Sequence, residues 1–189
     1  MIEIRKYKVE NLNLRNVNYY MGQRNGQAIE GMPERIDKAL KVLLPVFDGK
    51  VCFMESDVPD VESVDLKRHL VGCKKVLLMA ATIGAEADRE RMRAAVKSPV
   101  DQLIYDAVGT EAIENVCDTF CKDMEGRYGK LTSRFSPGYG DLPLEYQKDM
   151  ITVLDTNRKI GVSLTDSLLM SPTKSVTAII GIKENTTLD

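Results

Sequence analysis

The stretch from Lys74 to Thr82 is the feature of this chain that most limits its fold. Its middle, from Val76 to Ala81, is an unbroken apolar run. A run of this kind predicts a strand that is buried on both faces. Such a strand needs a neighbouring strand on each side and a covering layer on each face. The chain is therefore predicted to build a sheet around this strand and to cover it with helices.

Other segments predict the elements that surround this strand. Alternating or short apolar runs predict further strands at residues 2–9, 51–54, 162–164 and 176–182. Proline starts and apolar spacing predict helices from Pro33 to Leu44, over residues 85–97, from Pro99 to Gly126, and from Pro143 to near Arg158. Because these elements follow one another without regular βαβ units, we predict an α+β fold with a mixed or antiparallel twisted sheet flanked by helices.

The remaining segments are predicted as connections. Residues 11–31 are rich in Asn and Gly, which indicates a long loop or a frayed helix, and residues 58–65 are interpreted as a connection. Residues 165–170 are predicted to form a turn or a short helix. Residues 183–189 are interpreted as a tail that is disordered at its end. Gly109, inside the longest helix, is expected to allow close packing against a neighbouring element.

Composition narrows the class of function. The 189 residues include 43% hydrophobic and 29% charged residues, which suits one globular domain. The net charge is −2 and no long block of Lys and Arg occurs, which argues against nucleic-acid binding. No apolar run reaches the length of a membrane span, and the N-terminus lacks the apolar centre of a signal peptide. We therefore expect a cytoplasmic protein that does not bind membranes.

Few residues suit metal or redox chemistry. The chain has four cysteines and one histidine, and their spacing indicates neither a disulfide framework nor a zinc site. Cys117 and Cys121 stand one helical turn apart, which leaves a redox role as one interpretation. We favour small buried hydrophobic residues, because no activating cation is evident near them in the sequence. His69 is interpreted as a solvent-facing side chain, and a metal ligand is the alternative. No catalytic residue and no metal site are predicted.

The hexapeptide from Arg134 to Tyr139 predicts a small-molecule loop that continues to residue 142. Arg134 carries a permanent charge on a planar fork that suits a carboxylate. Pro137 fixes its own φ and Gly138 permits backbone conformations closed to side chains, so the loop can present backbone groups to a flat polar ligand. Tyr139 can lie along a ring while its hydroxyl stays hydrogen-bonded. The alternative interpretation is an ordinary turn in which Arg134 pairs with a surface carboxylate.

Four blocks in the C-terminal half together resemble the activation domain of vitamin B12-dependent methionine synthase. The blocks are Arg134-x-x-Pro137-Gly138-Tyr139 followed by Pro143, Gly161-Val162-x-Leu164-Thr165-Asp166-Ser167, Met170-Ser171-Pro172, and Ser175-Val176-Thr177. They occur in the family's order and at nearly its spacing, over residues 105–182. The segment Ala80-Ala81-Thr82-Ile83-Gly84 resembles the strand-to-helix turn of single-domain relatives, so the chain is identified as a stand-alone activation domain.

This resemblance implies a domain organisation, a ligand and partners. It implies one domain over residues 1–189, with an N-terminal strand and helix part at 1–100, a ligand-binding core at 101–182 and the tail. In the family, the domain binds S-adenosylmethionine and supports the reductive methylation of cob(II)alamin that is carried on another domain. The cobalamin here would sit on a separate methionine synthase or related corrinoid protein, with a flavodoxin or ferredoxin as electron donor. The chain would then be a component of a methyltransferase.

The resemblance also implies how the loop contacts the ligand. Arg134 would bind the carboxylate of S-adenosylmethionine. Ser136, with its neighbours Pro137 and Gly138, would offer main-chain groups to the adenine ring. Tyr139 would border the methyl group or the face of the cobalt.

The resemblance also implies an acidic ligand contact, and the sequence differs from the family's pattern at three places. Glu111 stands where the family places an acidic ligand contact, facing the ammonium or the sulfonium, and Glu114 is the alternative one turn along. The family's His-Pro-x-x-x-Tyr-like segment after the last strand is replaced by residues 181–185, so its ligand tyrosine is absent. Ser171 stands in place of the family's Trp, and the family's N-terminal acidic contact has no counterpart that we can place.

Three functions follow as hypotheses. The first is an S-adenosylmethionine-binding reactivation module for a cobalamin-dependent partner. The second is a non-catalytic module that caps the partner's corrinoid without using S-adenosylmethionine, which the absent tyrosine favours. The third is an unrelated small-molecule binder, which the absence of a groove lined by Arg134 and Tyr139 would favour.

Overall fold

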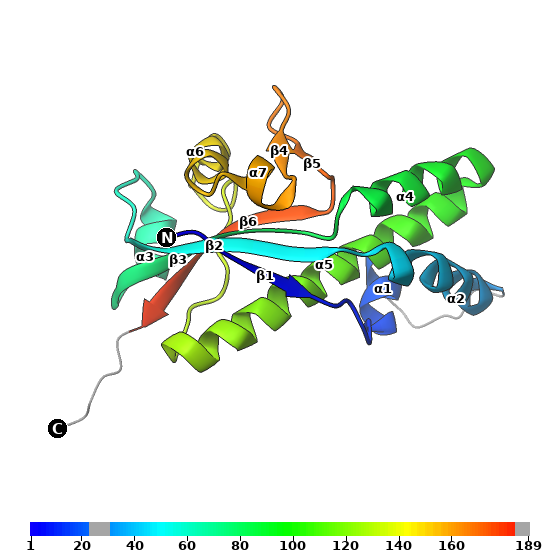
Figure 1. Cartoon of the computed structure of the whole chain (residues 1–189), viewed down its shortest axis with the longest axis horizontal. Coiled ribbons are helices and arrows are strands. Elements are labelled where there is room, and N and C mark those ends of the chain that lie inside the picture. Colours follow the sequence, from blue (N-terminus) through cyan, green and yellow to red (C-terminus); the bar gives the residue numbers. More distant parts are fainter. Residues whose placement is uncertain (23–30, 184–189) are drawn as a thin grey trace.

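The structure is a computed structural model that describes residues 1–22 and 31–183 (Figure 1). Its main sheet has the order β1-β2-β3-β6, and each neighbouring pair is antiparallel. The strands are β1 (Glu3–Tyr7), β2 (Gly49–Asp57), β3 (Cys73–Thr82) and β6 (Ser175–Lys183). The predicted central strand is β3, which has a neighbour on each side and is buried from Val76 to Thr82. The α+β prediction is confirmed.

One face of the sheet is covered by the long helix α5 (Pro99–Tyr128), which crosses it diagonally (Figure 1). Alternate residues of the strands, such as Phe53 and Met79, point to this face, because successive side chains of a strand alternate between its faces. They pack with α5 side chains such as Val116 and Phe120 in one buried cluster.

The other face is covered by three short helices. These are α3 (Val64–His69), α6 (Tyr146–Val153) and α7 (Thr156–Ile160), with a small hairpin of β4 (Ser163–Leu164) and β5 (Met170–Ser171) beside them. Leu78 and Ile179, whose neighbours in sequence point to α5, pack here against Leu66 and Met150. The sheet is therefore the middle layer of the molecule.

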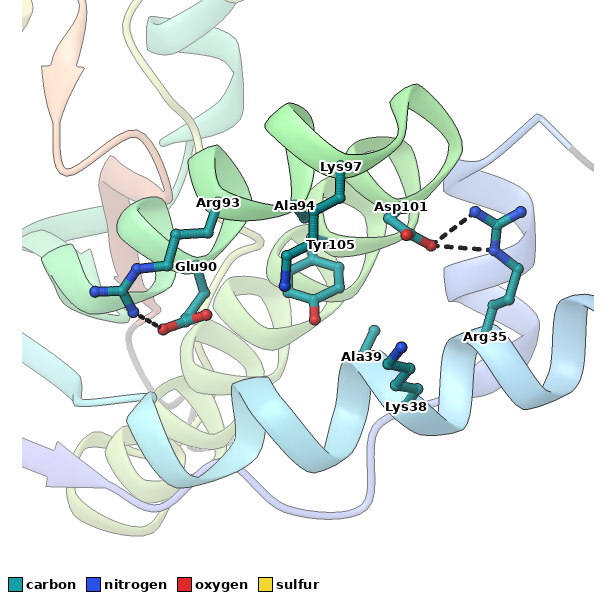
Figure 2. A pocket seen from close by; sticks show the side chains of 9 residues that line it. All are labelled: Arg35, Lys38, Ala39, Glu90, Arg93, Ala94, Lys97, Asp101 and Tyr105. Atoms are coloured by element: carbon teal, nitrogen blue, oxygen red, sulfur yellow. Dashed lines mark hydrogen bonds and ion pairs between the residues drawn. The ribbon is translucent and has the colours of Figure 1, made fainter.

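Three more helices gather at one end of α5 (Figure 1). They are α1 (Leu14–Tyr20), α2 (Met32–Leu43) and α4 (Ala85–Lys97), and a 3-10 turn at Leu44–Val46 follows α2. A third apolar cluster joins α1, α2 and the first half of α5. Side chains of α2, α4 and α5 also enclose a small pocket that opens to solvent (Figure 2).

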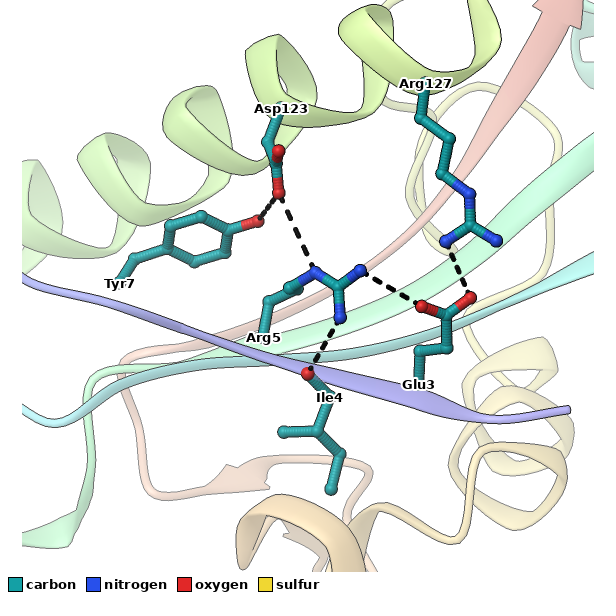
Figure 3. A network of polar contacts seen from close by, with 6 residues as sticks. All are labelled: Glu3, Ile4, Arg5, Tyr7, Asp123 and Arg127. Atoms are coloured by element: carbon teal, nitrogen blue, oxygen red, sulfur yellow. Dashed lines mark hydrogen bonds and ion pairs between the residues drawn. The ribbon is translucent and has the colours of Figure 1, made fainter.

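A polar network fastens the edge strand β1 to the far end of α5 (Figure 3). Glu3 accepts hydrogen bonds from Arg127 at 2.7 Å and from Arg5 at 3.1 Å. The Tyr7 hydroxyl donates to Asp123 at 2.7 Å. The contacts of Arg127 and Asp123 join residues more than a hundred positions apart, so they tie β1 to the last turns of α5.

Several predicted elements differ from the structure in extent. The helix at 85–97 agrees with α4. Helix α5 continues past Gly126 to Tyr128 and is capped by Gly129, whose φ of 76° is not helical. Strand β2 is longer than predicted, since it pairs with β1 on one side and β3 on the other.

Other predictions concern the type of structure. Residues 14–20 form a helix, which agrees with the frayed-helix alternative for residues 11–31. The connection predicted at 58–65 was wrong at its end, because α3 begins at Val64. The single helix predicted from Pro143 is two helices, since Asp155 between them has a φ of 47°. The prediction of a turn or a short helix at 165–170 is confirmed as a turn, in which the Thr165 hydroxyl accepts from the Leu169 amide. The predicted tail beyond 183 and part of the predicted loop at 11–31 lie outside the described residues.

Two further observations bear on the predictions. Gly109 lies against the methylene groups of Lys174, where an added Cβ would come within 3.3 Å, so its predicted close packing is confirmed. Within residues 1–22 and 31–183, no helix combines the length and apolar character that crossing a membrane requires.

Candidate functional site

The predicted loop begins as an extra strand at the open edge of β6. Phe135 exchanges backbone hydrogen bonds with Ile179, and Leu131 forms a second bridge with Ile182. Side chains in an extended segment alternate between faces, so Phe135 joins the cluster on the α3 and α6 face. Arg134 therefore points to the opposite face, towards α5.

A tight turn follows this segment. The Tyr139 amide donates to the Ser136 carbonyl at 3.1 Å, with Pro137 second and Gly138 third at a φ of 83°. This is the residue pattern of a type II turn. The Gly138 amide also donates, to the Leu142 carbonyl at 2.9 Å. The amides at the apex are thus used within the loop, whereas the Ser136 amide has no partner among the described residues.

Arg134 is held by two carboxylates of α5. Its Nη2 donates to Glu114 at 2.6 Å and to Asp118 at 3.1 Å, and its side chain is 21% exposed. These contacts are the surface pairing that was the alternative interpretation of this residue. They occupy one nitrogen of the guanidinium, so Nη1 and Nε keep no oxygen partner among the described residues and can donate to a second anion.

Glu111 lies one turn earlier on α5 and is 5% exposed. Its Oε1 accepts from the Asn13 amide at 3.0 Å, so it anchors the start of α1. Its Oε2 is buried and has no hydrogen-bond partner among the described residues. A buried carboxylate oxygen without a partner is costly, because its charge has lost water and gained nothing in exchange.

These acidic side chains form one cluster with Tyr20 of α1. Burial raises the pKa of the Tyr20 hydroxyl, and the charges of Glu114, Glu111 and Asp118 raise it further. Two carboxylates, those of Glu114 and Asp118, contact the guanidinium of Arg134, and that of Glu111 lies one turn earlier on α5. With three acidic groups and one cation the cluster has a net negative charge, and it can accept a cationic group beside Glu111.

Cys117 and Cys121 lie on the same side of α5 as this cluster. Burial raises the pKa of the Cys117 thiol to about 12, although the charge of Arg134 acts to lower it. The prediction that no cation lies nearby was wrong, since Arg134 also acts to lower the pKa of Cys121. The prediction that Cys117 is buried is confirmed, and Cys121 is half-buried. Burial outweighs the cation, so neither thiol is activated.

Tyr139 lies apart from this cluster. Its ring is 69% exposed and packs edge-to-face on Phe135, with centroids 5.4 Å apart. It borders an open depression of about 410 Å³ on the α3 side of the loop, which is lined by Asp65, Arg68, His69, Phe135, Tyr139 and Gly140. Arg134 does not line this depression. The structure therefore brings Arg134 and Glu111 towards one cluster and sets Tyr139 at a separate surface.

His69 is a lining residue whose role was missed in the sequence. It was interpreted as solvent-facing, but its Nε2 donates to the Ser133 carbonyl at 2.8 Å and its ring lies 5.1 Å from that of Phe135. It is half-buried because α3 carries it onto the loop. No sequence signal pairs it with residues more than sixty positions away.

Comparison with known proteins finds a family model that matches the part of the chain that contains this loop. Residues 119–187 match the model of the vitamin B12-dependent methionine synthase activation domain. The resemblance to the activation-domain family is confirmed. The matched residues include the loop with Arg134 and Tyr139, whereas Glu111 lies before them.

A solved structure has the same fold as this chain. It is described as the MetH reactivation domain bound to AdoHcy, and the two structures agree with a TM-score of 0.70 at 13% sequence identity. The match covers 100% of this chain and 80% of the other, so the whole described chain follows the reactivation-domain fold. No curated protein was found to match the chain in sequence.

Proposed function

We propose that the chain binds S-adenosylmethionine and supports the reductive reactivation of cobalamin on a partner methionine synthase. The observation that carries the proposal is the acidic cluster of Glu111, Glu114 and Asp118 beside the family's Arg134 loop. S-adenosylmethionine carries an ammonium and a sulfonium as well as a carboxylate. Its net charge is therefore positive, and it would compensate the net negative charge of this cluster.

The residues present fit the parts of this ligand. Nη1 and Nε of Arg134 are the donors left for its carboxylate. The unpartnered Oε2 of Glu111 is the acceptor for its ammonium or sulfonium. The amide of Ser136 is a donor for the adenine ring. Bound there, the sulfonium supplies an electrophilic methyl group, and these side chains hold and orient the molecule that carries it.

The partner's corrinoid is proposed to approach near Tyr139. The exposed ring of Tyr139 and the open depression beside it offer a surface that the chain itself does not cover. Methyl transfer to reduced cobalt also needs an electron donor, for which a flavodoxin or ferredoxin is the proposed class. No general acid or base is needed for this chemistry.

Calorimetry with S-adenosylmethionine tests the ligand. Replacing Arg134 with Ala removes a charge-assisted hydrogen bond worth about 1.5–3 kcal/mol, so we expect affinity to fall by tenfold or more. Arg158→Ala is the matched control, because Arg158 is an exposed arginine whose one ion-pair partner among the described residues is Asp155. If S-adenosylmethionine shows no measurable binding to the unaltered chain, the proposal is wrong.

Reactivation of a cob(II)alamin-loaded partner tests the function itself. The visible spectrum of the partner should change to that of methylcobalamin only when this chain, S-adenosylmethionine and a reductant are all present. An unchanged spectrum, with ligand binding intact, would leave a binding protein without a reactivation role.

The second candidate function is a module that caps the partner's corrinoid without using S-adenosylmethionine. The ion pairs of Arg134 with Glu114 and Asp118 favour it, because they already balance the charge of the guanidinium. Under this hypothesis the chain binds the partner but not S-adenosylmethionine, and Arg134→Ala leaves the complex with the partner intact.

A further inference from the structure

A small pocket between α2, α4 and α5 is separate from the site described above. Its α5 residues, Asp101 and Tyr105, lie towards the start of the helix. Tyr105 precedes Glu111, the first residue of that site on α5, by about 9 Å along the helix axis, at a rise of 1.5 Å per residue. From its charges and its size, we propose that this pocket binds phosphate, either as the free ion or as the phosphate group of a small metabolite.

The pocket carries a surplus of positive charge. Its lining includes four cations, from Arg35, Lys38, Arg93 and Lys97, and two carboxylates, from Glu90 and Asp101. A lining with this balance stands out in a chain whose net charge is −2.

Each carboxylate in the pocket is matched by an arginine. Asp101 accepts from Arg35 through Nη2 at 2.8 Å and Nε at 3.0 Å, and Glu90 pairs with Arg93 (Figure 2). Arg35 also donates to the Ser98 hydroxyl at 3.0 Å, which ties α2 to the first turn of α5. Within each pair the two charges cancel. The net positive charge of the lining therefore comes from the two lysines, Lys38 and Lys97.

The two lysines and a tyrosine supply unused donors. Lys38 on α2 and Lys97 on α4 make no ion pair with any residue that the structure describes. The Tyr105 hydroxyl likewise has no hydrogen-bond partner within the described part of the chain. Burial raises the pKa of this hydroxyl, and the charges of Glu90 and Asp101 raise it further, so it keeps its proton and can donate. Side chains from all three helices face the same gap (Figure 2).

The size of the pocket selects a compact anion. Its volume is about 60 Å³, and its lining includes the small side chains of Ala39 and Ala94. A cavity of about 10–15 Å³ on such a measure holds one water, so this one admits a tetrahedral oxyanion but not a nucleobase or a peptide helix. The rest of a phosphorylated ligand would extend into solvent.

Calorimetric titration with inorganic phosphate, and separately with a phosphate monoester such as glycerol phosphate, tests the proposal. Chloride at matched ionic strength provides the reference. We expect saturable binding in the millimolar range that weakens as salt is raised, because the lysines are exposed and their charges are screened. A monoester that binds more tightly than the free ion identifies a metabolite as the ligand, and the reverse order identifies inorganic phosphate.

The double variant Lys38→Gln/Lys97→Gln should weaken phosphate binding by about tenfold or more. The matched control is Lys122→Gln/Lys148→Gln, which removes the same charge from exposed lysines elsewhere and should leave binding unchanged. Tyr105→Phe is expected to weaken binding by a smaller factor. Absence of saturable binding to the unaltered chain, or equal binding by the two double variants, would overturn the proposal.

Discussion

At the scale of single residues, Gly138 is the position where the loop requires a glycine. Its φ is 83°, and a Cβ there would come within 3.2 Å of Leu144. A left-handed conformation costs other residues about 1–2 kcal/mol. We expect Gly138→Ala to lower the free energy of unfolding by about that amount in a urea titration and to weaken ligand binding with it.

Gly126→Ala is the matched control for this substitution. Gly126 is helical and has nothing within 4 Å of its missing Cβ. Ala is favoured over Gly in a helix by about 1 kcal/mol, so this variant should be more stable than the parent chain. Equal effects of the two substitutions would show that the turn at 136–139 does not require a left-handed residue.

A substitution at Glu111 can distinguish a role in ligand binding from a role in folding. Gln keeps an oxygen to accept from the Asn13 amide but removes the buried charge whose second oxygen has no partner. We expect the free energy of unfolding of Glu111→Gln to equal or exceed that of the parent chain. We expect the variant to bind S-adenosylmethionine about tenfold more weakly, since a charge-assisted contact is worth about 1.5–3 kcal/mol. Calorimetry and urea unfolding on the same preparation measure both quantities, with exposed Glu62→Gln as the control. Unchanged affinity would leave Glu111 only its anchoring role.

At the scale of elements, Asp141 joins the binding loop to α3. Its carboxylate accepts from the Ser63 hydroxyl and from the amides of Val64 and Asp65. The hydrogen bond from Ser63 is the largest of the effects that lower the pKa of this carboxyl below its ordinary value of 3.8. A lowered pKa in the folded state means that this stabilisation is complete above 3.8 and is lost as pH falls through the folded value.

Melting temperatures between pH 7 and pH 3 check this linkage. Asp141→Asn should melt below the parent chain at pH 7, and the difference should shrink below pH 4 as the parent's carboxyl takes up a proton. Asp166→Asn, on an exposed turn, should show no such trend. A difference that stays constant down to pH 3 would contradict the assignment.

The elements also show what the sequence could predict. Strand β3 and helix α4 were predicted because their apolar spacing and end signals are local. Helix α3 was missed because it has only six residues, although Ser63 caps it by accepting from the Leu66 amide. The direction of Arg134 could not be predicted, because it depends on which residues of the loop pair with β6. Only the structure places Glu114 and Asp118, rather than Tyr139, beside it.

At the scale of the whole molecule, one cluster connects segments from both ends of the chain. Asn13, at the start of α1, donates to Glu111, and Arg134 contacts Glu114 and Asp118 one to two turns further along α5. A ligand that engages both Glu111 and Arg134 must therefore stabilise α1 as well as the loop, because α1 begins at the anchoring amide. The helices on the other face of the sheet have no part in this cluster.

Hydrogen exchange with and without saturating S-adenosylhomocysteine measures this coupling. We expect slower exchange in peptides that cover residues 11–20 and 134–142, and unchanged exchange in α6 on the far face. The Asn13 amide is the most informative reporter, since its acceptor is the side chain proposed to meet the ligand. Protection confined to 134–142 would mean that Glu111 does not engage the ligand. Equal protection of α6 would mean a general rise in stability, because stabilisation by mass action alone slows exchange through global unfolding everywhere.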